Sequence, residues 1–206
     1  MRSMRSRSPR AGIRAVVAAL LLAGCGPGTP DPPQLAFWNA VRDLCGQAFE
    51  GRAVEWTAVD AEAAAAPLVL DVWQCYHDEI RLAFHIGDDA SRVWLLTRDA
   101  EGLHLTHEVH GEDGTASDAS GYGGVAGEEG TASRQAFRPD SETNARLPVA
   151  AGSIWTLEIV PHERLTYAFR SDREAVTFRV DFDLTGHVTD RPPAPWGYTR
   201  SSRPAS

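Results

Sequence analysis

Residues 176–184 read Val-Thr-Phe-Arg-Val-Asp-Phe-Asp-Leu, with an apolar side chain at every second position and polar ones between. Successive side chains of a β-strand point to opposite faces, so this alternation predicts a strand with one buried face. The same period of two recurs in residues 54–58, 80–86, 103–109 and 164–169, and apolar residues on both faces mark further strands at 68–75, 92–98 and 154–160. The chain is therefore predicted to be mainly β.

The connections between these segments indicate how the strands pair. Turn-forming stretches at 87–89, 99–102 and 171–173 are short, which favours antiparallel hairpins. About eight regularly spaced strands of this kind are typical of an antiparallel β-barrel or β-sandwich. Residues 34–48 differ because their apolar residues fall at helical spacing, and they predict one N-terminal helix.

The stretch 111–148 interrupts this rhythm with many Gly, Ser and acidic residues. A long structureless loop is unusual in a compact domain and is then either functional or disordered. Short irregular strands at 122–125 and 133–137 are the alternative.

The first 24 residues have the composition of an export signal. Five arginines and no acid precede the apolar run 15–22, which is too short to span a bilayer. The following Leu22-Ala23-Gly24-Cys25 resembles the lipobox of bacterial lipoproteins, with an ordinary signal peptide as the alternative. The resemblance implies that Cys25 becomes the acylated first residue and anchors the protein in a lipid bilayer.

The lipoprotein sorting rule adds a destination. An Asp directly after the acylated Cys retains a lipoprotein in the inner membrane, and Gly26 stands there instead. The resemblance thus implies the periplasmic face of the outer membrane of a Gram-negative host. The expected organisation is a lipoprotein signal at 1–24, a lipidated Pro/Gly tether at 25–33, a single β-rich domain at 34–190 and a Pro-rich tail at 191–206.

Charge and cysteines narrow the class of protein further. Beyond residue 24, 15 arginines stand against 28 acids, a net charge of −13 that repels nucleic acids. Cys45 and Cys75 are an even pair in a chain bound for an oxidising compartment, so a Cys45–Cys75 disulfide is expected. Two buried thiols are the alternative.

Three histidines lie close together in the sequence, at positions 104, 107 and 110, and acids follow them. Histidine and carboxylate side chains are common metal ligands, so His107, His110 and Glu112 are a candidate divalent metal site. Solvated or hydrogen-bonded histidines are the alternative. His107 falls on the apolar face of its predicted strand and would be an interior polar group in a barrel.

A barrel interior lined by aromatic residues also suits a small ligand. Trp94 and Tyr167 fall on predicted strands, and with His107 and Arg92 they are the candidate ligand-binding residues. The sequence contains neither a Gly-x-Ser-x-Gly elbow, nor a phosphate-binding Gly-rich motif, nor His-Glu-x-x-His. Because these catalytic motifs are missing, the sequence favours binding over catalysis. No cofactor is expected apart from the metal considered above.

Several segments together resemble an uncharacterised family of bacterial secreted or lipid-anchored proteins, across most of residues 37–185. They are Phe37–Asn39, Leu44–Gly51, Ser91–Trp94, Gly102–Leu103, His110–Gly114, Tyr122–Gly124 and Phe178–Asp183. The resemblance implies no activity. One opening helix followed by antiparallel strands is also similar to calycin-type barrels such as lipocalins.

The leading hypothesis is therefore a lipid-anchored protein that binds a small, partly apolar ligand without catalysis. One alternative is an envelope interaction module that docks a protein through the acidic surface or the 111–148 loop. The other is a metal-dependent enzyme or metal carrier that uses the segment His104–His110.

Overall fold

The computed structural model describes residues 32–57, 61–171 and 176–199. The predicted signal, the lipobox cysteine Cys25 and most of the tether lie outside the described residues. None of the helices in the described ranges is both long and apolar enough to cross a membrane.

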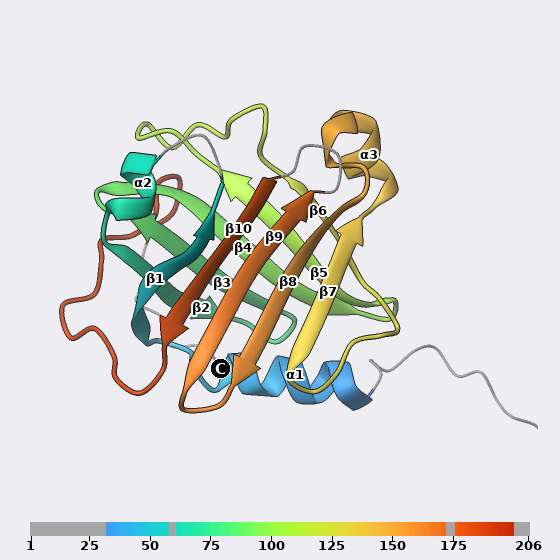
Figure 1. The fold of residues 1–206 in the computed structure, drawn as a ribbon, viewed down its shortest axis with the longest axis horizontal. Coiled ribbons are helices and arrows are strands. Elements are labelled where there is room, and N and C mark those ends of the chain that lie inside the picture. Colours follow the sequence, from blue (N-terminus) through green and yellow to red (C-terminus); the bar gives the residue numbers. More distant parts are fainter. Residues whose placement is uncertain (1–31, 58–60, 172–175, 200–206) are drawn as a thin grey trace, which may run out of the picture.

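The described residues form ten antiparallel strands in one closed barrel (Figure 1). Each strand pairs with the next along the chain, and the last pairs with the first. The strands are β1 (Ala48–Trp56), β2 (Leu68–Cys75), β3 (Glu79–Ile86), β4 (Asp89–Asp99), β5 (Gly102–Val109), β6 (Tyr122–Ala126), β7 (Arg134–Pro139), β8 (Ser153–Val160), β9 (Arg164–Ser171) and β10 (Val176–Asp183). The prediction of an antiparallel β-barrel with an N-terminal helix is confirmed, with two strands more than expected. The calycin-like architecture fits as well.

Short helices mark the two ends of the barrel. Helix α1 (Pro32–Arg42) lies across one end, and α2 (Ala61–Ala65) and α3 (Ser141–Arg146) lie at the other, where the 3-10 turn η1 (Pro148–Ala150) follows α3 (Figure 1). We call these the α1 end and the α3 end.

Helix α1 closes its end of the barrel with a single apolar stripe. Phe37, Trp38 and Val41 are fully buried and pack against the barrel core, at the spacing that brings side chains to one helix face. The side chain of Gln34 accepts a hydrogen bond from the backbone N–H of Leu103, 3.1 Å away, and so ties the helix to β5.

The two additional strands, β6 and β7, lie in the stretch that interrupts the sequence rhythm. Gly123 and Gly124 of β6 lie so close to their neighbours that side chains have no room there. A Cβ atom on Gly123 would lie 2.0 Å from the carbonyl oxygen of Leu105, and one on Gly124 would lie 1.8 Å from that of Arg138. Glycine is therefore required at both positions, and a strand built this way shows no apolar alternation.

Strand β1 departs from the alternation predicted for residues 54–58, of which Ala58 lies outside the described residues. A register shift between Ala53 and Glu55 introduces a β-bulge, after which the face that points inward changes. Val54 is consequently 39% exposed, although the pattern placed it on the buried face. Trp56 does turn inward, because its ring contacts that of Phe178 at 4.4 Å.

The segment 185–199, which we call the C-terminal strap, packs along the outer side of the barrel. Its backbone donates hydrogen bonds from Val188 to Ala48 and from Trp196 to Ala90. Tyr198 packs edge-on against Trp73 of β2 at 5.4 Å and completes a small outer apolar cluster. The sequence predicted a Pro-rich tail from residue 191, and the structure shows its first nine residues held against the barrel.

Cys45 and Cys75 form the predicted disulfide, with their Cα atoms 6.2 Å apart. The bridge links the turn after α1 to the last residue of β2. It therefore fixes the helix to the end of the barrel that it closes.

Candidate functional site

The barrel interior is packed with apolar side chains, and their exposure differs between its ends. At the α1 end, the inward residues of the strands are buried beneath the helix. Toward the α3 end, four aromatic rings pack against the same core and stay partly exposed. They are Trp56, Tyr122, Phe169 and Phe178.

His107 is buried in this interior and makes two hydrogen bonds. Its Nδ1 atom lies 3.3 Å from the backbone carbonyl oxygen of Tyr122, which can only accept, so Nδ1 carries the proton. Its Nε2 atom lies 2.8 Å from the hydroxyl oxygen of Tyr167 and accepts a hydrogen bond from that hydroxyl. The histidine is thus held as one neutral tautomer.

Aromatic rings enclose this pair of hydrogen bonds. The ring of Tyr122 stacks on His107 at 4.7 Å, and Trp94 stacks on Tyr167 at 4.0 Å. Trp155 approaches His107 at 5.3 Å from a third side. Three of the four predicted ligand-binding residues, Trp94, His107 and Tyr167, are therefore brought together.

Burial sets the protonation of these groups. Desolvation lowers the pKa of His107 to about 3, against the small opposing effect of its bond to the Tyr122 carbonyl. Burial also raises the pKa of Tyr167 well above its usual value. The cluster is uncharged at neutral pH, and it offers hydrogen bonds without a formal charge.

Arg92, the fourth predicted residue, lies nearer the α3 end. Arg92 points inward like Trp94, because the two residues are two positions apart on β4. In register it is paired with Phe84 of β3 on one side and with Val109 of β5 on the other. Its guanidinium pairs with Asp89 and contacts the hydroxyl of Ser91 at 3.2 Å. Burial raises the pKa of Tyr122, and the charge of Arg92 partly opposes this effect.

A continuous aromatic wall runs across four neighbouring strands. Trp56 pairs in register with Phe178, Phe178 with Phe169, and Phe169 with Trp155. These four rings therefore lie at one level of the interior, on β1, β10, β9 and β8. The candidate residues predicted from the sequence do not include this wall, although strand alternation indicates three of its members.

Two serines extend the inward faces of β8 and β9 beyond this wall. Ser153 and Ser171 lie directly opposite one another in register, and they are only 1% and 4% exposed. Neither hydroxyl has a hydrogen-bond partner among the described residues. The indole N–H of Trp56 is likewise buried without a partner there.

The predicted metal ligands are not assembled. His107 points into the barrel, whereas the His110 ring packs against Tyr198 of the C-terminal strap at 5.3 Å, and Glu112 is exposed in the following loop. These residues lie on different sides of the β5 backbone and do not form one coordination sphere.

Within the described ranges, the one group with suitable metal-ligand spacing consists of Asp99, Glu101 and His104. It lies at the β4–β5 hairpin, where Asp99 accepts hydrogen bonds from the Glu101 backbone at 2.8 Å and lies 3.0 Å from His104 Nε2. These contacts fasten the hairpin without any ion.

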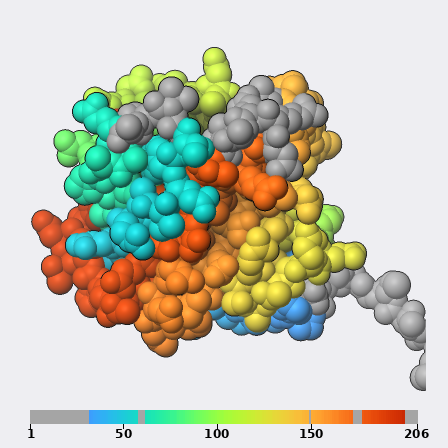
Figure 2. Space-filling model, viewed as in Figure 1, coloured from blue at the N-terminus to red at the C-terminus, as the bar shows by residue number. Residues whose placement is uncertain are grey.

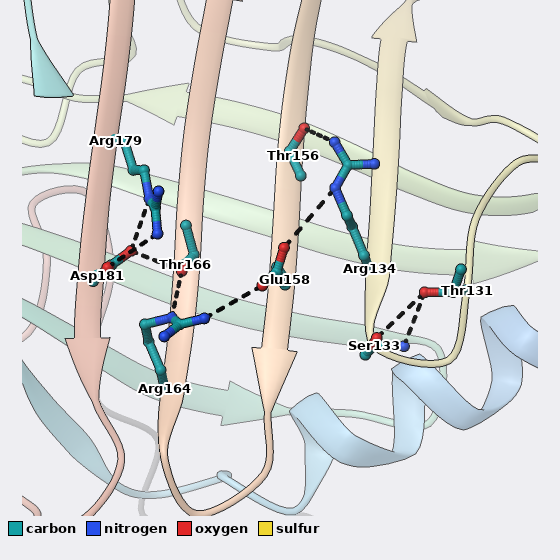
Figure 3. A network of polar contacts seen from close by, with 9 residues as sticks. All are labelled: Thr131, Ser133, Arg134, Thr156, Glu158, Arg164, Thr166, Arg179 and Asp181. Carbon is teal, nitrogen blue, oxygen red and sulfur yellow. Dashed lines mark hydrogen bonds and ion pairs between the residues drawn. The ribbon is translucent and has the colours of Figure 1, made fainter. Parts of the chain in front are cut away.

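The outer face of β7–β10 carries a ladder of polar side chains (Figure 3). Asp181 binds Arg179 and the hydroxyl of Thr166, and Glu158 lies between Arg164 and Arg134. Arg179 and Asp181 pair within β10, whereas Glu158 of β8 pairs with arginines of both neighbouring strands, which supports the sheet.

A shallow groove of about 420 Å³ lies on the same face, where β1 meets β10 (Figure 2). Its lining combines four acids with two arginines: Glu50, Arg52, Glu163, Arg164, Asp181 and Asp183. Asp181 and Arg164 belong to the polar ladder, so part of the lining already has partners. The groove therefore offers less distinctive chemistry than the interior.

No family model, curated protein or solved structure matches the chain. The chemistry of the barrel interior is thus the main guide to function.

Proposed function

We propose that the protein binds a small, partly apolar molecule in the α3 end of its barrel, without catalysing a reaction. The observation that carries this proposal is the partial exposure of the inward rings of Trp56, Tyr122, Phe169 and Phe178. Ligand sites are commonly apolar concavities with a few fixed polar groups, and barrel mouths are a frequent place for them. Fully packed rings, by contrast, would have no solvent-facing surface for a ligand to cover.

The His107–Tyr167 pair, which lies deeper in the barrel than the exposed rings, also supports this proposal. Both side chains are buried, and each of their positions is fixed by a hydrogen bond and by a stacked ring. Groups held in this way lose little conformational entropy when a ligand is bound. The pair would form a rigid, uncharged base for the site.

We further propose that the protein is exported and anchored by lipid on Cys25 to the periplasmic face of an outer membrane. The leader composition and the lipobox resemblance support this location. The Cys45–Cys75 disulfide supports it too, because disulfides persist mainly in oxidising compartments. A tether of several residues would separate the barrel from the bilayer.

The binding proposal is tested with N-phenyl-1-naphthylamine, a neutral apolar dye that becomes fluorescent out of water. The chain beginning at Gly26 suits this test, because its barrel is closed and contains its own disulfide and strap. We expect saturable binding, weakened about tenfold by Phe169→Ala, since burying a Phe ring stabilises by about 1.5–3 kcal/mol.

Tyr76→Ala is the matched control, because it removes an aromatic ring that is 43% exposed outside the barrel. It should leave the dye affinity unchanged. Lack of saturable binding, or equal loss in both variants, would contradict an interior site. In that case a partner protein on the barrel surface becomes the better hypothesis.

A further inference from the structure

Among the described residues, the buried hydroxyls of Ser153 and Ser171 have no hydrogen-bond partner, which is unusual for a folded protein. Buried polar side chains nearly always find a hydrogen-bond partner, and leaving one without a partner costs free energy. Here two such groups lie side by side, on adjacent strands and at the same register position. Directly opposed residues of antiparallel strands have Cβ atoms about 5 Å apart, close enough for both hydroxyls to reach one atom.

Both hydroxyls belong to the inward face. Ser153 alternates with Ile154 and shares its face with Trp155, which is 2% exposed in the core. Ser171 shares its face with Phe169, two residues earlier on β9. The serines therefore extend the aromatic wall toward the α3 end, and the wall and the hydroxyls together form one amphipathic surface.

This surface carries no formal charge. The inward residues of β8, β9 and β10 that the structure describes are aromatic, aliphatic or hydroxyl-bearing. Arg92 faces the same interior from β4, where Asp89 already pairs with it. An ionised ligand group placed at the serines would lose its hydration without gaining a counter-ion, which is costly.

We propose that the ligand is a ring-bearing molecule with an uncharged oxygen acceptor, such as a ketone, which receives hydrogen bonds from Ser153 and Ser171. Its ring packs on Phe169 and Phe178, which are partly exposed members of the wall. The indole N–H of Trp56 is a third donor on the same wall. This assignment rests on the proposed interior site and adds the chemical class of its ligand.

Three matched probes test the class: 2-acetylnaphthalene with a neutral carbonyl, 2-ethylnaphthalene without oxygen, and 2-naphthoate with a charge. Equilibrium dialysis against the chain beginning at Gly26 gives each affinity. We expect the ketone to bind about fivefold more tightly than the ethyl compound, since a neutral hydrogen bond has a modest net value. The carboxylate should bind most weakly.

The double variant Ser153→Ala/Ser171→Ala gives a second readout. It should lose the fivefold preference for the ketone while keeping its affinity for 2-ethylnaphthalene. Without any probe it should melt higher than the parent, by about 3 °C, because it removes two unsatisfied buried hydroxyls. Ser133→Ala, which removes an exposed hydroxyl, is the control and should change neither property.

The outcomes separate the two proposals. If no probe binds, the interior site itself is wrong. If the ketone and the ethyl compound bind equally, or the double variant keeps the preference, the site stands and the serine assignment is overturned. A lower melting temperature in the double variant would also overturn it, because the hydroxyls would then be satisfied in the free protein.

Discussion

The Nε2 atom of His107 accepts a hydrogen bond from the Tyr167 hydroxyl across 2.8 Å, between β5 and β9 on opposite sides of the barrel. The two residues are 60 positions apart in the sequence. This contact therefore spans the interior instead of following the sheet.

Acid should destabilise the protein through His107. In the unfolded chain this imidazole has a pKa near 6.5, whereas in the folded chain burial lowers its pKa to about 3. Its contribution to stability is complete above pH 6.5 and decreases as pH falls toward 3, by up to about 1.4 kcal/mol per pH unit. Urea unfolding of the parent and of His107→Gln, which cannot titrate, measures this contribution. Parallel pH profiles would show that the imidazole is not buried as a neutral group.

Tyr167→Phe should destabilise the fold by about 1–3 kcal/mol. The ring and its stacking on Trp94 would remain, but the Nε2 acceptor of His107 would lose its donor in a buried site. Urea unfolding gives the change in free energy. The comparison is Tyr76→Phe, which removes an exposed hydroxyl bonded to Gln74 and should cost little. Equal effects in the two variants would argue against the internal bond.

Reduction of the Cys45–Cys75 bridge should lower the free energy of unfolding by about 2–4 kcal/mol, because the two cysteines are 30 residues apart. Thermal unfolding with and without dithiothreitol measures this. Cys45→Ser/Cys75→Ser should unfold at the same temperature in both conditions, near that of the reduced parent. A further decrease of the variant in reductant would point to another redox-sensitive group.

Arg191→Ala should loosen the C-terminal strap and cost about 3 kcal/mol. It removes a cation that pairs with Asp71, whose side chain is fully buried, and breaking one side of a buried pair is expensive. Chemical unfolding and the rate of chymotrypsin cleavage after Trp196 and Tyr198 of the strap measure the effect. Adding Asp71→Asn should recover part of the loss, since it removes the charge as well. If the double variant is no better, the ion pair is not the cause.

Cys25→Ala should abolish incorporation of an alkyne-tagged fatty acid during growth in a Gram-negative host, because the lipidated thiol is gone. Click labelling of the immunoprecipitated protein gives the readout. Cys45→Ser is the matched control and should be labelled as strongly as the parent. Persistent labelling of Cys25→Ala would place any acyl group on another residue.

The extent to which the sequence predicts the fold depends on how each strand is packed. β10 and β5 are half-buried, so an apolar residue at every second position reveals them. β6 cannot show that pattern, because its central positions must be glycine to let neighbouring backbones approach. The bulge in β1 likewise shifts the alternation by one residue, and Val54 is consequently exposed.

The candidate site divides in a similar way. His107, Tyr167 and Trp94 stand out as unusual side chains on predicted strands, and they meet in the interior. Ser153 and Ser171 do not stand out in the sequence. Ser171 falls within the predicted turn 171–173, where serine is common, whereas the structure places it as the last residue of β9. Ser153 lies just before the predicted strand 154–160 and is the first residue of β8. Only the register of β8 on β9 shows that they face each other. The strap contacts of Tyr198 are equally unpredictable, since no periodic pattern accompanies them.

The seam between β1 and β10 has a consequence for the order of folding. Every other pair in the barrel joins consecutive strands, whereas Thr57 and Thr177 at this seam are 120 residues apart. Hairpins can form early, but the barrel can close only after β10, the last strand of the chain, has been synthesised. Until then β1 keeps an open edge to which another chain can add a strand. At high concentration, newly made chains would therefore risk exchanging their final strands. This risk would last until residues 176–183 have been synthesised and have paired with β1.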